Sequence, residues 1–184
     1  MPNIKNIKQT MKKQGIPAEV ISKPLNDKQP EAVIEFISQM DKLLSKEQCL
    51  AIMEEQGCFK GKISEPFCEF GKKYADKSIE EKIKLLDELK SAFRVPCHLN
   101  PDGSLSIYFE FGEKDKYTCI CRTMKGVSNT VKVPLTYCGC CAGHVRYTHQ
   151  FALGVKLTLK KVVSSPIHSG GKKRCEFLFE IAEG

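Results

Sequence analysis

The first half of the chain carries apolar residues at the three- and four-residue spacing of amphipathic helices. Pro30 can occupy the first turn of a helix, and apolar positions follow it from Val33 to Leu44. A shorter helix is expected to begin at Ser64, with Pro66 in its first turn. Two capping boxes predict further helix starts: Ser45 with Gln48, and Ser78 with Glu81, whose helix carries an apolar face to Phe93.

Period-two alternation replaces this pattern after the turn residues near positions 96–103. Four apolar residues then share one face of a strand: Leu105, Ile107, Phe109 and Phe111. We expect positions 117–123 to pair back as the second strand of a hairpin. A helix is predicted for positions 138–153, ended by Gly154, and two further strands are predicted for 155–161 and 175–181.

This order of helices, hairpin, helix and hairpin predicts an α+β fold with a mostly antiparallel sheet. A chain of 184 residues suits one domain. We expect a helical segment, residues 1–95, and an α+β cysteine-rich domain, residues 96–184, to pack as one compact unit. Residues 1–28 begin with a polar, Lys-rich stretch and are expected to be loosely attached.

Composition and charge exclude several classes of function. No apolar run approaches the roughly 18 residues that a membrane helix needs, and the start does not resemble a secretory signal. We therefore expect a cytoplasmic protein with no membrane partner. The formal net charge is +7, but lysines alternate with glutamates and arginine is scarce, which indicates a solvated surface and no specific nucleic-acid site.

Ten cysteines are the unusual feature of the composition. In a reducing compartment, metal binding or redox chemistry is expected before disulfides. The start of the helix at 138–153 carries four candidate ligands: Cys138, Cys140, Cys141 and His144. His144 is a helical neighbour of both Cys140 and Cys141, at four and three residues. The positive potential at a helix start also favours thiolate.

Zinc is the metal that this cluster suggests, with four protein ligands in a structural site or three and a water in a catalytic one. The completing ligand would be Cys175 or His168. Cys119 and Cys121, on one face of a predicted strand, form another pair. The alternative is that these are small residues that only fill the core. Other residues are given no role in the site: Cys58 is expected to be exposed, His149 to lie on the helix surface or to pack, and Ser164–Ser165 lacks the context of a nucleophile elbow.

Motifs in the last third of the chain carry a resemblance to a known family. They are Cys138-Gly-Cys-Cys-Ala-Gly-His144, Phe151-Ala-Leu-Gly154, Val155-Lys-Leu-Thr-Leu, and Gly171-Lys-Lys-Arg-Cys175-Glu-Phe177. Together they resemble the 4-vinyl-reductase-type small-molecule-binding domain. They also look like the aminothiazoline-carboxylate hydrolase-like proteins and cysteine-rich bacterial proteins of unknown function.

The resemblance implies an α+β domain that often forms a homodimer and encloses a small hydrophobic ligand. Some members hold zinc through a cysteine at the helix start and two cysteines that flank the last hairpin. Carried over to this chain, the last of these would be Cys175, and the first would be Cys138, Cys140 or Cys141. The loop at 163–168 has no cysteine, and His168 is the substitute that it offers.

The leading hypothesis is a small-molecule-binding or sensor-like protein with a cysteine-based site that can hold zinc. One alternative is a hydrolase acting on a C–N or C–S bond, with Cys140 or Cys141 as nucleophile and His144 as base. The other alternative is a partner-binding adaptor without metal, which would expose an apolar patch. Whether the protein is an enzyme stays open at this point.

Overall fold

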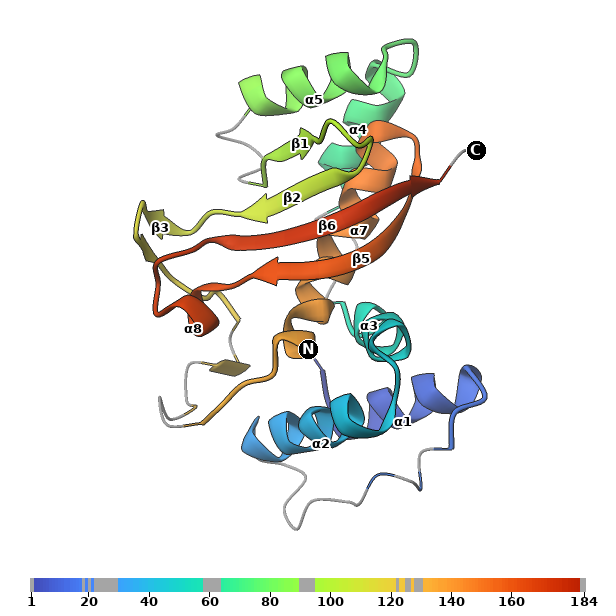
Figure 1. Ribbon diagram of the computed structural model, residues 1–184. Coiled ribbons are helices and arrows are strands. Elements are labelled where there is room, and N and C mark those ends of the chain that lie inside the picture. The colour runs from blue at the N-terminus through green and yellow to red at the C-terminus, as the bar shows by residue number, and fades with distance from the viewer. Residues whose placement is uncertain are drawn as a thin grey trace.

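The structure is a computed structural model that describes residues 2–17, 19, 21, 30–57, 64–89, 95–121, 123, 124, 127 and 131–182. Two residues named in the sequence analysis, Cys58 and Phe93, lie outside this range. Within it the chain has an α+β fold, as the sequence predicts (Figure 1). No helix of the described part combines the length and the apolar character that crossing a bilayer would require.

Helices fill the first half of the chain. Their bounds are α1 Ile4–Lys13, α2 Pro30–Leu43, α3 Lys46–Glu54, α4 Glu65–Lys73 and α5 Ile79–Glu88. Both predicted capping boxes are confirmed at the starts of α3 and α5. In each, the serine Oγ accepts a hydrogen bond of 3.2 Å from the backbone N–H three residues later. Local sequence therefore determines where these two helices begin.

Helix α1 corrects, for residues 4–13, the expectation that residues 1–28 are loosely attached. Ile4, Ile7 and Met11 lie on one face of α1 and are buried. The helix is also tied to α3 by the Gln56 side chain, whose Nε2 donates to Thr10 Oγ1 at 3.0 Å. Over α1 the prediction was wrong because Lys5, Lys12 and Lys13 are exposed while the apolar residues share the buried face of an amphipathic helix.

The main sheet is antiparallel and has the strand order β1-β2-β6-β5. The strands are β1 Cys97–Leu99, β2 Leu105–Phe109, β5 Lys156–Ser164 and β6 Cys175–Ala182. Figure 1 shows α7 (Gly139–Leu153) lying across one face of this sheet, with α5 near one end of the molecule and α1 and α2 near the other. The C-terminal hairpin, β5 with β6, is the one that the alternation predicts.

The other predicted hairpin is wrong. Strand β2 pairs with β1 and β6, so that Phe109 lies opposite Cys175 and Leu105 opposite Phe179. Only a short ribbon, β3 Gly112–Glu113 with β4 Lys116–Tyr117, follows β2. The longer β6 buries Phe177 and Phe179 fully, which gives it more apolar area to bury beside β2 than the segment after Tyr117 offers.

Two hydrophobic cores divide the interior. The sheet core lies between the sheet, α4, α5 and α7, and includes Leu105, Ile107, Val145, Leu153, Phe177 and Phe179. The helical core lies among α1, α2 and α3, and includes Ile7, Met11, Phe36, Ile37, Met40 and Ile52. Helices α3 and α7 contribute buried residues to both cores. These two helices therefore join the two halves of the molecule.

Helix α7 is held close to its neighbours at both ends. A Cβ at Gly143 would overlap the carbonyl oxygen of Glu54, so glycine lets α7 approach the end of α3. At its other end, α7 stops at Gly154 in the left-handed conformation, with φ of 71°. There the buried Lys82 Nζ donates to the carbonyl of Leu153 at 3.0 Å.

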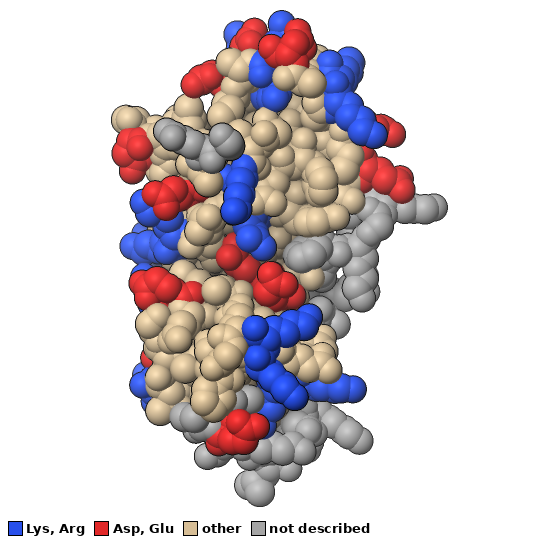
Figure 2. Space-filling view, turned by 90° about the vertical axis from the view of Figure 1, so that its right-hand side faces the viewer, with Lys and Arg blue, Asp and Glu red and all other residues tan. Residues whose placement is uncertain are grey.

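Charged side chains of both signs are mixed on the surface. On the face that Figure 2 shows, Lys and Arg lie among Asp and Glu, and neither sign covers the whole face. The ion pair of Lys160 with Glu180 likewise places a positive side chain of β5 beside a negative one of β6. This distribution agrees with a solvated surface.

Candidate functional site

Five cysteine side chains line one small, mostly enclosed space of about 10 Å³, which we call the thiol cavity. They come from four separate parts of the chain: Cys119 and Cys121 after β4, Cys138 at the end of the short helix η4 (Leu135–Cys138), Cys141 in the first turn of α7, and Cys175 at the start of β6. Apolar and aromatic neighbours complete the wall: Phe109, Ile120, Met124, Tyr137 and Ile167. A space of this size is near the lower limit for one water molecule, so it does not admit an organic ligand.

Three of the six residues predicted as ligands line the thiol cavity, namely Cys138, Cys141 and Cys175. Cys140 is buried in the helical core instead. The ring centre of His144 lies 6.0 Å from that of Phe109, a residue of the sheet core. Cys140 and His144 thus pack in different surroundings, although they are four residues apart on one helix. His168 lies outside the cavity, in the groove described below.

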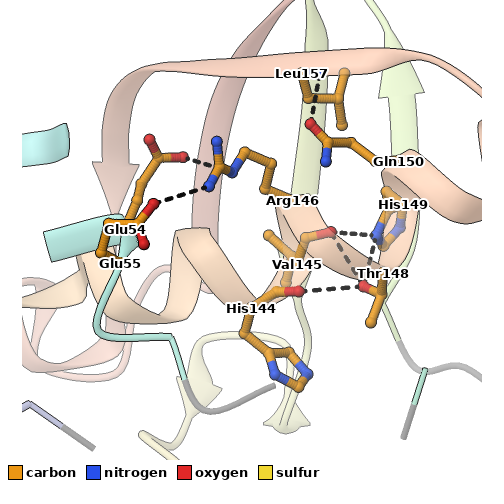
Figure 3. Close-up of polar contacts among 9 residues, drawn as sticks. All are labelled: Glu54, Glu55, His144, Val145, Arg146, Thr148, His149, Gln150 and Leu157. Atoms are coloured by element: carbon orange, nitrogen blue, oxygen red, sulfur yellow. Dashed lines mark hydrogen bonds and ion pairs between the residues drawn. The ribbon is translucent and has the colours of Figure 1, made fainter. Parts of the chain in front are cut away.

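The histidines of α7 point in different directions. Figure 3 shows His144 directed away from Arg146, which reaches toward the carboxylates of Glu54 and Glu55. His149 is fully buried, with Nδ1 at 2.9 Å from the carbonyl oxygen of Val145. Of the two expectations for His149, helix surface or packing, packing is confirmed, and its ring does not line the thiol cavity.

The arrangement of the side chains does not fit a metal ion. Across the described ranges, no group of three or more His, Cys, Asp or Glu side chains is arranged to hold one. The described cysteines are all free thiols. Thiols are suitable donors for zinc, yet here they surround the cavity without converging on a common point. The zinc site stays a prediction from the sequence, and no chemical step below depends on a metal.

Burial keeps three thiols of the cavity protonated, those of Cys119, Cys138 and Cys175. Desolvation raises the pKa of Cys119 to about 11 and raises the pKa of Cys138 and Cys175 further. The neighbouring thiols add to each of these rises, because one thiolate disfavours a second nearby. At neutral pH these cysteines are therefore weak nucleophiles unless a neighbouring group takes up the proton.

One such group is linked to Cys138 through a serine. Ser165 is buried and forms a side-chain hydrogen bond with Cys138 that acts to lower the pKa of the thiol. Its Oγ also lies 2.8 Å from Nδ1 of His168, which is exposed. Ser165 is the N-cap of the short helix α8 (Pro166–Ser169), which fixes the hydroxyl between the two partners. A buried thiol, a hydroxyl and an exposed imidazole are thus connected in series.

An open groove of about 750 Å³ adjoins the thiol cavity. We call it the apolar groove, and its described lining is Met124, Val127, Val131, Lys132, Val133, Pro166, Ile167, His168 and Gly170. Met124 and Ile167 line both the groove and the cavity. Two side chains therefore separate a space large enough for a small molecule from a space lined by five thiols.

No family model, curated protein or solved structure matches this chain. The resemblance to the 4-vinyl-reductase-type domain accordingly stays a prediction.

Proposed function

We propose that this protein binds a small, largely apolar molecule in the apolar groove, and that the thiols behind the groove sense its presence. The groove itself supports the first part. Its volume of about 750 Å³ lies within the range of roughly 300–1,000 Å³ that small-molecule sites occupy. The binding of a small hydrophobic molecule is also what the sequence resemblance implies.

The lining suggests the chemical class of the ligand. Six of the nine described lining residues are apolar. Lys132 and His168 are both exposed and are the cationic or proton-donating groups among them. An apolar body that carries one carboxylate or similar anion would bury its apolar surface on the valines and place its charge near Lys132.

The wall shared with the thiol cavity supports the sensing part. Met124 and Ile167 would contact a ligand on one side and the thiols on the other. Cys141 is partly exposed, and a shift of either side chain would change its access to solvent. Thiol reactivity would then depend on whether the groove is filled. A cytoplasmic location, where thiols stay reduced, belongs to the same proposal.

Titration with the fluorescent anion anilinonaphthalene sulfonate tests binding, because this probe combines an apolar body with one negative charge. We expect saturable binding with one site per chain. The change Ile167→Glu places a carboxylate in the wall and should weaken binding at least tenfold, because it both adds polarity and repels the anion.

Val163→Glu is the matched control, since Val163 is exposed on β5 and does not line the groove. Circular dichroism checks that both variants keep the fold. Equal binding by the two variants would place the probe elsewhere and would contradict the proposal.

A further inference from the structure

Cys138 and Cys141 have the C-x-x-C spacing at the start of a helix of 15 residues. Both line the thiol cavity, and neither is in a disulfide. Residues three apart at a helix start are neighbours, and these two side chains line the same small space. The sequence predicts metal binding or redox chemistry for these cysteines, and no group of three or more metal ligands is found among the described residues.

The two thiols differ in solvent exposure and in hydrogen bonding, and this difference suits a reaction in two steps. Cys141 is partly exposed, whereas Cys138 is only 6% exposed. Cys138 is the thiol that is hydrogen-bonded to Ser165, and Ser165 contacts the exposed His168. The accessible thiol can meet a reagent from solution, while the buried thiol has a path along which its proton can leave.

We propose that Cys141 and Cys138 are a thiol–disulfide exchange pair that reduces small disulfides, with Ser165 and His168 carrying the proton of Cys138. This activity goes beyond ligand binding, and it does not require the proposed function of the groove to be correct. The substrate class is a low-molecular-weight disulfide, R–S–S–R, which also supplies the oxidising equivalents.

Two exchanges complete the reaction. In the first, the Cys141 sulfur attacks one sulfur of the disulfide, whose S–S bond breaks. A mixed disulfide forms on Cys141, and the departing thiolate takes up the proton that Cys141 lost. In the second, the Cys138 thiol passes its proton through Ser165 to His168 and attacks the Cys141 sulfur. The Cys138–Cys141 bond forms and the second thiolate leaves, protonated from His168. Overall, two thiols of the protein become one disulfide and R–S–S–R becomes two R–SH.

The proton path gives Ser165 and His168 positioning roles with a distinct kinetic signature. They act only on Cys138, so they affect the second exchange and not the first. Loss of a general base costs typically 10²–10⁴-fold in the assisted step. The final ratio of disulfide to dithiol should not change, because neither residue is consumed.

The experiment adds one equivalent of the aromatic disulfide 5,5′-dithiobis(2-nitrobenzoate) to the reduced, full-length protein. We expect two coloured thiolates per chain, released in two phases, and a Cys138–Cys141 bridge in the peptide map after acid quench. Cys141→Ser should remove both phases. His168→Gln should slow only the second phase, by at least tenfold, without changing the yield of bridge.

His98→Gln and Cys68→Ser are the controls, because His98 is exposed on β1 and Cys68 lies on α4, neither of them in the cavity. Both should leave the two phases unchanged. A stable adduct on Cys141 without a second release, a bridge from Cys141 to Cys175, or a second phase that His168→Gln leaves intact would each overturn the proposal. Circular dichroism confirms that each variant is folded. No dye is added to the exchange reaction, so a failed exchange is distinguished from failed dye binding in the groove.

Discussion

At the scale of single residues, the buried His149 makes the interior of α7 sensitive to pH. Its Nδ1 lies 2.9 Å from the carbonyl oxygen of Val145, and its Nε2 lies 3.1 Å from that of Val95. A neutral imidazole donates to only one of these carbonyls. Even so, burial lowers the pKa of His149 from about 6.5 to about 4, since desolvation outweighs the two carbonyls.

This shift predicts how stability depends on pH. Between pH 6.5 and 4 the unfolded chain takes up a proton at this residue that the folded chain does not. The contribution of His149 is therefore complete above pH 6.5 and is lost as the pH falls toward 4, by roughly 3 kcal/mol in total. His149→Gln should remove this loss, which urea unfolding at pH 7.5 and pH 4.5 measures. His98→Gln, an exposed histidine, is the control.

Glu54 changes the stability with pH in the opposite direction, over an overlapping pH range. The effect of His149 is therefore measured as the difference between His149→Gln and the parent protein. Burial raises the pKa of Glu54 from 4.5 to about 7, although the charge of Arg146 acts to lower it. Its contribution is complete below pH 4.5 and is lost as the pH rises through 7. If the slope of stability with pH is the same in His149→Gln and in the parent protein, His149 does not titrate as described.

The sequence predicted part of the candidate site at this scale. Cys138, Cys141 and Cys175 were found because local spacing places two of them at a helix start and the third on an inward strand face. Cys119 and Cys121 were noticed as a pair, but only the tertiary fold brings them to the same cavity. The sequence gives Ser165 no role. Its contact with His168 lies within the cap of α8, but Cys138 reaches it only through the tertiary fold.

At the scale of elements, two glycines let α7 lie close against α3. Gly139 and Gly143 lie on the side of α7 that meets α3. A Cβ at Gly139 would come within 2.8 Å of the Met53 Cβ, and one at Gly143 would overlap the Glu54 backbone. Any added carbon must therefore push the start of α7 away from α3.

Gly143→Ala is expected to destabilise the protein by about 2 kcal/mol. Overpacking against rigid backbone costs about 1–3 kcal/mol, and here it exceeds the gain of about 1 kcal/mol from the better helix propensity of alanine. Gly139→Ala should cost less, because a Cβ there overlaps the Met53 Cβ, at 2.8 Å, less than a Cβ at Gly143 overlaps the Glu54 carbonyl oxygen. Thermal unfolding of both variants shows which substitution destabilises the protein more. Equal or raised stability of Gly143→Ala would mean that the two helices are not in close contact.

Elements were predicted well where the pattern within the segment decides the outcome. The capping boxes and the alternation of β6 are local, and both were confirmed. The pairing of β2 is not local, because several strands compete for the same edge and β6 offers two fully buried phenylalanines. In β5 the register shifts between Leu159 and Lys161, so that Val162 points inward although simple alternation would place Lys161 there.

At the scale of the whole molecule, the two cores are linked by elements that belong to both. In α3, Leu50 packs in the sheet core while Ile52 packs in the helical core. Near the start of α7, Ala142 packs in the sheet core and Cys140 packs in the helical core. Neither core can lose its structure without removing part of the wall of the other. Cooperative unfolding of the segments 1–95 and 96–184 follows from this arrangement.

Two buried thiols can report on the two cores separately. Cys49 is fully buried in the helical core and Cys97 is 4% exposed in the sheet core. Burial raises the pKa of both to about 12, so both resist alkylation while the fold is intact. Brief alkylation at increasing urea, followed by peptide mass spectrometry, should give one midpoint for the two residues.

Ile7→Ala sharpens this test, because Ile7 is fully buried in α1 and touches the helical core alone. The truncation should cost about 2–5 kcal/mol. If the molecule unfolds as one unit, the midpoints of Cys49 and Cys97 fall together, although Cys97 lies in the other core. If only the midpoint of Cys49 falls, the helical core opens on its own. The thiol cavity, whose wall includes Tyr137 of the helical core and Phe109 of the sheet core, would then lose one side before the rest of the protein unfolds.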